Sequence, residues 1–274
     1  MAGAPGGTVA EGGRGTRRGA AAAAHIGTSG WAYPGWRGIF YPRDLRQGEW
    51  LGHYARFFDT VEVNASFYRL PTEKLIAAWC ARTPEGFRFA VKAWRAITHY
   101  RRLAACEDLL ADFFDRIAHF GDRLGPVLFQ LPPRFPADPG RLARFLERLP
   151  KGHRYAFEFR DPSWHREAVY GLLRKAGAAF CPFDLAGLLG PRVVTADFVY
   201  VRLHGHERRY RGAYDEALLA DWARWLRQRR EEGREVWFYF DNTDEAAHAV
   251  FDAMRLRRLL GQSAPATAAP LTNP

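Results

Sequence analysis

Short apolar runs alternate along this chain with longer stretches in which apolar residues recur at helical spacing. The runs predict eight strands, at 25–31, 60–66, 87–94, 125–132, 155–161, 178–184, 198–205 and 236–242. The stretches between them predict helices at roughly 49–58, 72–82, 107–120, 139–149, 165–176, 215–231 and 244–260. Strands that alternate with helices are typical of βαβ units and a parallel sheet. We therefore expect a closed α/β barrel of the TIM (β/α)8 type, with an open doubly wound sheet as the alternative.

The ends of the predicted elements carry matching local signals. Residues of the N-cap or first-turn kind precede three helices (Asp138, Asp215, and Thr243 or Asp244), and Gly177 and Gly233 follow the ends of two. The segment 185–195 after the sixth strand is short and broken by proline and glycine, so one crossover is expected to be reduced. No GxGxxG or Walker motif follows a predicted strand, which counts against a nucleotide-binding doubly wound fold.

Polar side chains collect near the carboxyl end of the predicted strands. From the second strand to the seventh they are Glu62 and Asn64, Lys92 with Arg95 just beyond, Gln130, Glu158 and Arg160, Asp184, and Arg202 and His204. The eighth strand ends in Asp241-Asn242, of which only one can point inward. Catalytic residues of such barrels come from this end of the strands, so the pattern predicts a functional pocket there.

The residue types suit acid/base chemistry on an anionic or sugar-like molecule. Lysine and arginine would hold a phosphate or carboxylate, a carboxylate could act as general base, and His204 or Lys92 as general acid. The predicted catalytic residues are Glu62, Lys92, Glu158, Asp184 and His204. The predicted substrate-binding residues are Asn64, Tyr68, Arg95, Gln130, Arg160, Trp164, Arg202 and Asn242. Isomerase, lyase and hydrolase reactions all remain open.

A divalent metal is the alternative, held by Glu158, Asp184 and His204. Three nearby cations would compete with it for the carboxylates, so no cofactor is predicted. Serine or cysteine catalysis has little support, because Ser29 lacks a GxSxG context and Cys181 lies in an apolar run. The three cysteines form no CxxC motif, which favours reduced thiols in a cytoplasmic protein.

Composition adds a basic balance and two low-complexity ends. The formal net charge of +10 is compatible with a nucleic-acid partner, but equally with an arginine-rich composition on solvated faces. Residues 1–24 and 261–274 are expected to be disordered tails around a single barrel domain at 25–260. No apolar stretch approaches membrane-spanning length, so no membrane partner is expected. The oligomeric state stays open.

Seven motifs in order make the chain similar to the YecE-like proteins, the family called domain of unknown function 72. They are GTSGWAYPGW, FFDTVEVNASFYRLP, FAVKAWRAITH, GPVLFQLPPRF, AFEFRDPSW, TADFVYVRLHG and YFDNTDEAAHAV. The resemblance runs from about His25 to Leu260 and implies a TIM-barrel fold without supplying a reaction. The chain departs from the pattern at Trp94, where proline is usual, and at Asp241, where asparagine is usual.

Three functions are therefore weighed. The leading hypothesis is an enzyme with a mainly cationic pocket at the top of the barrel. The others are a nucleic-acid-binding or nucleic-acid-processing barrel, which needs a continuous basic face, and a non-catalytic ligand-binding barrel.

Overall fold

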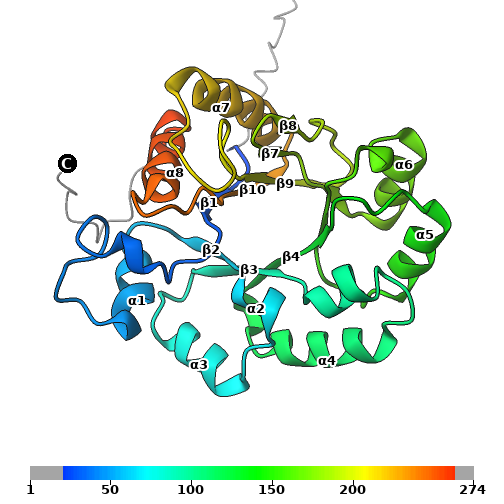
Figure 1. Cartoon of the computed structure of the whole chain (residues 1–274), viewed down its shortest axis with the longest axis horizontal. Helices are drawn as coiled ribbons and strands as arrows, with labels where there is room; N and C mark the ends of the chain where they lie inside the picture. Colours follow the sequence, from blue (N-terminus) through cyan, green and yellow to red (C-terminus); the bar gives the residue numbers. More distant parts are fainter. Residues whose placement is uncertain (1–20, 263–274) are drawn as a thin grey trace, which may run out of the picture.

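Two sheets of mainly parallel strands form the centre of the protein, and helices surround them (Figure 1). The structure, a computed structural model, describes residues 21–262. The sheets have the strand orders β1-β10-β9-β7-β8 and β2-β3-β4-β5-β6. The strands are β1 (Ala24–Thr28), β2 (Thr60–Val63), β3 (Arg88–Lys92), β4 (Leu124–Leu131), β5 (Tyr155–Phe159), β6 (Ala179–Phe180), β7 (Phe183–Leu185), β8 (Leu188–Leu189), β9 (Phe198–Leu203) and β10 (Glu235–Phe240). The α-helices are α1 (Trp50–Tyr54), α2 (Ala65–Tyr68), α3 (Glu73–Ala81), α4 (Glu107–Ala118), α5 (Pro139–Arg148), α6 (Glu167–Ala176), α7 (Glu216–Glu231) and α8 (His248–Leu259).

The sheets are not closed into one ring of strands, which corrects the expectation of a closed barrel. The predicted sixth strand is divided into β6, which pairs with β5, and β7, which pairs with β9. Pro182 lies at the break and has no N–H to continue a ladder. On the other side, β1 and β2 meet through a single bridge between Ser29 and Glu62. The α/β class with parallel strands is confirmed.

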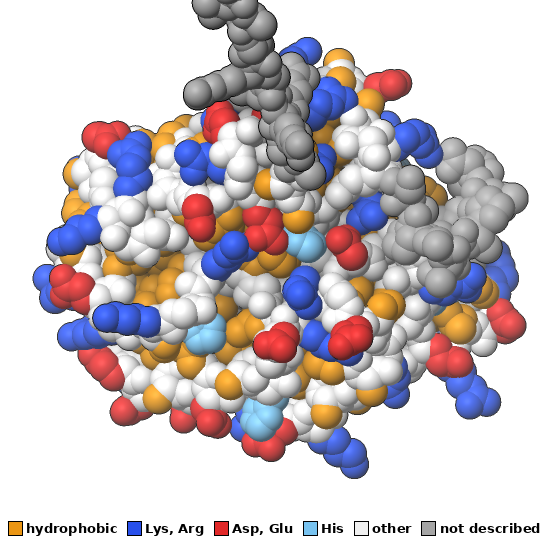
Figure 2. Space-filling view, turned by 180° about the vertical axis from the view of Figure 1, so that it is seen from behind, with side chains coloured by type: hydrophobic (Ala, Val, Ile, Leu, Met, Phe, Trp, Pro, Cys, Tyr) orange, Lys and Arg blue, Asp and Glu red, His pale blue; other side chains and the backbone are white. Residues whose placement is uncertain are grey.

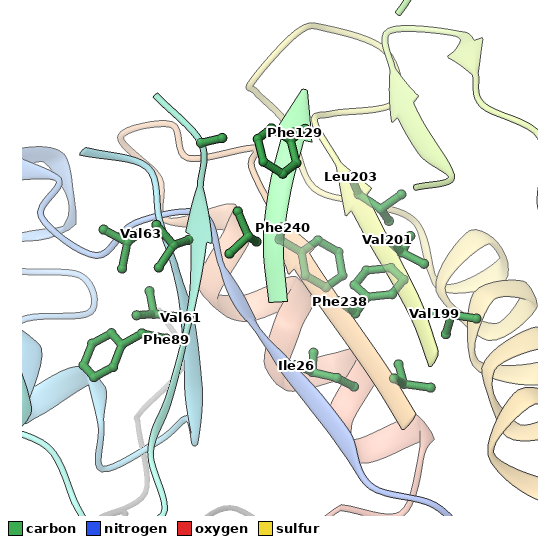
Figure 3. Packing of buried hydrophobic residues seen from close by; sticks show 14 of the residues in the cluster. Ile26, Val61, Val63, Phe89, Phe129, Val199, Val201, Leu203, Phe238 and Phe240 are labelled. Carbon is green, nitrogen blue, oxygen red and sulfur yellow. The ribbon is translucent and has the colours of Figure 1, made fainter. Parts of the chain in front are cut away.

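Side chains alternate along each strand between an inner cluster and an outer one. Along β9, Phe198 and Tyr200 belong to the inner cluster, whereas Val199, Val201 and Leu203 belong to the outer one. The outer cluster includes α7 and α8 residues, and Figure 3 shows its side chains along the strands. The apolar positions predicted to pack against helices therefore do so.

The reduced crossover after the sixth strand is a hairpin. β7 and β8 pair antiparallel through Asp184 with Leu189 and Leu185 with Leu188. Ala186 and Gly187 connect them with φ of 51° and 83°, as two-residue hairpin loops of the primed type require.

Most helix ends follow the sequence signals. Asp138 and Asp215 accept hydrogen bonds from the backbone of their helices, and Gly177 and Gly233 have positive φ. The last helix begins later than predicted, with Ala247 at its N-cap, although the Asp244 carboxylate still accepts from the backbone N–H of His248. None of the described helices is long and apolar enough to cross a membrane.

Residues just outside the predicted domain 25–260 also make contacts with it. Ala24 is buried in β1, and the Ala22 N–H donates to the Arg230 carbonyl, so residues 22–24 are part of the fold. Gln262 donates from its side chain to the Ala24 carbonyl. The remainder of both predicted tails, 1–20 and 263–274, lies outside the described residues.

Candidate functional site

Arg202 is the centre of a buried ionic network at the carboxyl ends of the strands. It lies near the end of β9 and is 0% exposed. Its Nη2 donates to Glu62 Oε1 at 2.7 Å and to Asp241 Oδ2 at 3.1 Å, and its Nη1 donates to Glu158 Oε2 at 2.8 Å. One guanidinium thus joins carboxylates from three separate parts of the chain, which offsets the cost of burying each of them.

Two hydroxyl groups fix the Glu62 carboxylate. Ser29 Oγ donates to Oε1 at 2.5 Å, and the Tyr200 hydroxyl donates to Oε2 at 2.6 Å. Sequence analysis did not place Ser29 or Tyr200 in the site. Ser29 could have been found from the position of GTSGW at the end of the first strand. Tyr200 could have been found because it lies two residues before Arg202 and so shares its face of the strand.

Glu158 is held in its ionised form by two arginines. Arg160 Nε donates to its Oε1 at 2.6 Å, opposite the contact from Arg202. Burial by itself would raise the pKa of Glu158, but the charges of Arg160, Arg202 and His204 outweigh it and hold the pKa well below the usual value. A carboxylate with so low a pKa is a weak proton acceptor.

His204 connects the carboxylates and the arginines of the network. Its Nδ1 lies 2.8 Å from Asp241 Oδ2, where it donates. Its Nε2 lies 3.3 Å from Arg160 Nη2 and 3.3 Å from Arg202 Nη1. The same Nε2 lies 3.4 Å from Glu158 Oε2, so it faces both hydrogen-bond donors and an acceptor.

Asp241, and not Asn242, points into the network. The inner residues of β10 are Trp237 and Tyr239, and the same alternation continues to Asp241. Asn242 points outward, where its Nδ2 donates to Gly212 O at 2.7 Å and to Asp252 Oδ2 at 2.8 Å. This corrects the assignment of Asn242 to the pocket. Each residue of VWFYF could face either side of the sheet, so the sequence did not show which of Asp241 and Asn242 points inward.

Lys92 borders the network without joining it. The residue is 7% exposed, and no described carboxylate lies within ion-pair distance of its Nζ, which sits 4.1 Å from the centre of the Phe67 ring. Burial, together with the charge of Arg202, lowers the pKa of Lys92 to about 8, although nearby carboxylates oppose the shift. An amine with this pKa can exchange a proton near neutral pH.

The lowered pKa of His99 indicates a positive potential beside Lys92. This residue lies on a π-helical turn, Ala96–Tyr100, a type of turn often found at functional sites. Burial lowers its pKa to about 4, helped by the charges of Lys92, Arg160, Arg102 and Arg95. Sequence analysis missed His99, because the loop after the third strand carried no periodic signal.

Four other predicted substrate residues lie at the border of this region. The Arg95 guanidinium lies 5.6 Å from the centre of the Tyr68 ring. Tyr68 and Asn64 line a cavity of about 630 Å³ with Trp31, Tyr33 and Trp79, and the buried Asn64 Oδ1 has no hydrogen-bond partner among the described residues. Gln130 is buried, and its Nε2 donates to Leu131 O at 2.7 Å.

Asp184 and Trp164 lie apart from the network. Asp184 pairs in register with Leu203, an outward position of β9, and hydrogen-bonds to His206. Trp164 is fully buried, stacks on Phe159 and donates from Nε1 to Phe135 O at 2.6 Å. Both were expected in the pocket; the first is turned outward by strand alternation, and the second anchors a loop.

The position of Asp184 counts against the predicted metal site. Since Asp184 faces away, the set Glu158, Asp184 and His204 is not brought together, and the described residues hold no group of three or more His, Cys, Asp or Glu suited to a metal ion. The cysteines of the described chain are free, with Cys106 and Cys181 buried.

Strained backbone also gathers at this end of the strands. Within residues 21–262, seven residues other than glycine have positive φ: Arg102, Leu103, Ala105, Arg134, Ala186, Tyr210 and Ala247. All lie in segments that follow a strand, and Tyr210 accepts from Arg160 Nη1 at 3.1 Å. Such strain is costly and tends to occur at functional sites.

The fold and the site define an α/β protein with a buried polar network at the carboxyl ends of parallel strands. The chain belongs to the family described as protein of unknown function DUF72, whose model matches residues 25–274.

Known members agree with this assignment. The UPF0759 protein YecE of Escherichia coli K12 is 34% identical over 142 residues, covering 51% of this chain and 49% of that protein, so this match spans about half of each. The UPF0759 protein YunF of Bacillus subtilis is 27% identical over 80% of this chain and 88% of its own length. The crystal structure of a DUF72 family protein from Thermotoga maritima has a TM-score of 0.79 at 27% identity and covers 88% of this chain and 100% of that one. A DUF72 protein from Enterococcus faecalis shares the fold, with a TM-score of 0.75 at 19% identity, covering 88% of this chain and 96% of that one.

Proposed function

We propose that this chain is an enzyme of the barrel type that binds a small anionic substrate over Lys92, His99 and Arg160 and moves a proton there. The observation that carries the proposal is the buried Lys92 amine, which has no ion-pair partner among the described residues. The two arginines and three carboxylates of the network contact each other directly, so Lys92 is the cation of this region that no direct ion pair holds among the described residues.

The barrel-type architecture is part of this proposal. The bridge between Ser29 and Glu62 and the continuous chain through Cys181-Pro182 are the two places where the sheets approach each other. Together they would bring the carboxyl ends of the parallel strands of both sheets to one end of the barrel. Barrel enzymes have their active sites at that end.

The residues divide into those that would contact substrate and those that position them. Lys92 would act as the general acid or base, because its pKa of about 8 allows both forms near neutral pH. Glu62, Glu158 and Asp241 would orient Arg202 and His204, since each of these carboxylates already accepts from Arg202. The aromatic cavity with Trp31, Tyr68 and Asn64 would accept a sugar-like portion by stacking and hydrogen bonding.

Surface charge gives less support to a nucleic-acid partner. Figure 2 shows Lys and Arg interspersed with Asp and Glu on the face that it draws. Several arginines are also paired with carboxylates at the surface, as Arg174 is with Glu167 and Arg192 is with Asp221. The basic balance would then reflect composition more than a binding face.

A thermal-stability screen tests the proposal. Phosphorylated sugars, inorganic phosphate, small carboxylic acids, neutral sugars and oligonucleotides are each added, since a ligand that binds the native state raises the melting temperature. We expect anionic small molecules to stabilise the protein, and Lys92→Met to abolish this effect while Lys74→Met, at an exposed position of α3, retains it. Stabilisation by oligonucleotides alone, with steep salt dependence, would replace the proposal with a nucleic-acid function. Stabilisation by anions that survives in Lys92→Met would remove Lys92 from the site.

A further inference from the structure

A second cavity, of about 670 Å³, lies beside β7 and is lined by Asp184. Apolar and aromatic side chains line much of it, including Phe183, Leu189, Leu218 and Trp222. It is bordered by the β7–β8 hairpin, which occupies the place of the missing crossover helix. Its volume is typical of pockets that bind small molecules.

A buried carboxylate forms the polar part of this cavity. Asp184 is 2% exposed; its Oδ2 accepts from His206 Nδ1 at 2.7 Å, and its buried Oδ1 has no hydrogen-bond partner within the described chain. Leaving a buried acceptor unsatisfied is costly, more so for a charged group. An incoming N–H or O–H donor would remove that cost.

The backbone at Gly205 brings His206 to this carboxylate. Gly205 has φ of 99°, and a Cβ there would lie 2.1 Å from the Arg208 carbonyl oxygen, so no other residue fits. The resulting turn places His206 beside Asp184, which lies on the neighbouring strand β7. Nδ1 donates to the carboxylate, so in the neutral form of the ring Nε2 is an acceptor.

The remaining polar groups make the cavity rich in acceptors and negative in charge. His165 donates from Nε2 to Phe159 O at 2.9 Å, which leaves its Nδ1 as another acceptor. Arg192 is the one lysine or arginine among the described lining residues, and it is paired with Asp221 at 2.6 Å and stacked on Trp222. With Arg192 paired, no arginine or lysine of the described lining contacts Asp184, and its ion-pair contact is with His206. A metal is a poor candidate for that role, since the described residues offer no metal-binding group here.

We propose that this cavity binds a small organic ammonium compound, whose N–H groups donate to Asp184 and His206 while its apolar part packs against Phe183, Leu189 and Trp222. The site is separate from the Lys92 region and does not depend on the function proposed there. An ammonium is favoured over a neutral alcohol because its positive charge adds Coulomb attraction to the hydrogen bond with the Asp184 carboxylate.

Isothermal titration of the full chain with benzylamine tests this inference, with benzyl alcohol as the neutral isostere and benzoate as the anion. We expect benzylamine to bind at least about tenfold more tightly than either, a difference of about 1.4 kcal/mol or more. Asp184→Asn should weaken benzylamine binding by at least about tenfold. Asp108→Asn, at an exposed position of α4 that does not line the cavity, is the matched control and should change it little.

A second variant keeps the proposal testable if Asp184→Asn fails to fold. Leu189 is 60% exposed on the hairpin, so Leu189→Trp should fold normally and narrow the cavity, reducing affinity for benzylamine without touching the carboxylate. Equal binding of benzylamine and benzyl alcohol, or a larger loss in Asp108→Asn than in Asp184→Asn, would overturn the proposal. Benzylamine binding that is lost in Lys92→Met would also overturn it, because the ligand would then occupy the other site.

Discussion

Arg202→Met removes the one guanidinium that contacts three buried carboxylates. Methionine keeps part of the side-chain volume, so the perturbation is mainly the loss of charge and hydrogen bonds. Glu62 and Glu158 are both 0% exposed and Asp241 is 5% exposed, so water can replace little of what is lost. Glu158 would retain Arg160, whereas Glu62 would keep only the hydroxyl groups of Ser29 and Tyr200.

The magnitude follows from the burial of these groups. Removing one partner of a buried ion pair costs about 3–5 kcal/mol, because the other charge is left unpaired. We expect a loss of at least that size in the free energy of unfolding, a large part of the roughly 5–15 kcal/mol typical of a native protein. Arg174→Met, which breaks an exposed pair with Glu167, should cost less than about 1 kcal/mol.

The loss should also depend on pH. In the native protein the pKa of Glu158 is depressed, so its stabilising contribution is present above the unfolded pKa of about 4.3 and is lost as pH falls through the lower folded pKa. Without Arg202, Glu158 keeps only the lowering effect of Arg160 and His204, so the variant gains less stability than the native protein as pH rises through this range. Urea unfolding at pH 4.5 and 7 should therefore show a larger difference between the two proteins at pH 7. A loss below about 1 kcal/mol at pH 7, or one that does not grow with pH, would refute the reasoning.

Three further predictions follow from single contacts. Lys92→Met should remove a rise in stability between pH 8 and about 10.4, because the unfolded state binds more protons than the folded state in that window; an unchanged rise in urea unfolding would contradict the assigned pKa. Trp164→Phe, which loses the hydrogen bond to Phe135 O, should cost about 1–3 kcal/mol by urea unfolding and leave any anion-induced thermal shift intact; a lost shift would return Trp164 to the substrate site. Asp138→Ala should cost about 1 kcal/mol, because its side chain accepts from Arg141 N at the start of α5; no change in the urea midpoint would show that the cap is replaced by water.

Much of the candidate site could be predicted because strand alternation is a local property. Glu62, Arg202, Glu158 and His204 were expected to point inward from their spacing, and the structure joins them in one network. The alternation also holds for Asp184, which it turns outward, since the break at Pro182 shifts the parity of the predicted sixth strand. An aromatic strand such as β10 gives no contrast between its faces, so the choice between Asp241 and Asn242 was open.

Whether the pocket is mainly cationic depends on which charges pair with each other, and the sequence does not show this. Arg202 is 140 residues from Glu62 and 44 from Glu158, and nothing local indicates that these charges pair. Only after pairing does Lys92 remain as the unpaired group, and only the position of the π-helical turn brings His99 beside it.

The sequence by itself thus determined the α/β class, the order of the elements and the side of most strands on which each charge lies, because these follow from backbone geometry over a few residues. The tertiary structure decided which charges neutralise each other, where the two sheets are interrupted and which face of β7 carries Asp184. Those properties depend on register between strands far apart in the chain, and a shift of one residue would move every side chain to the other face.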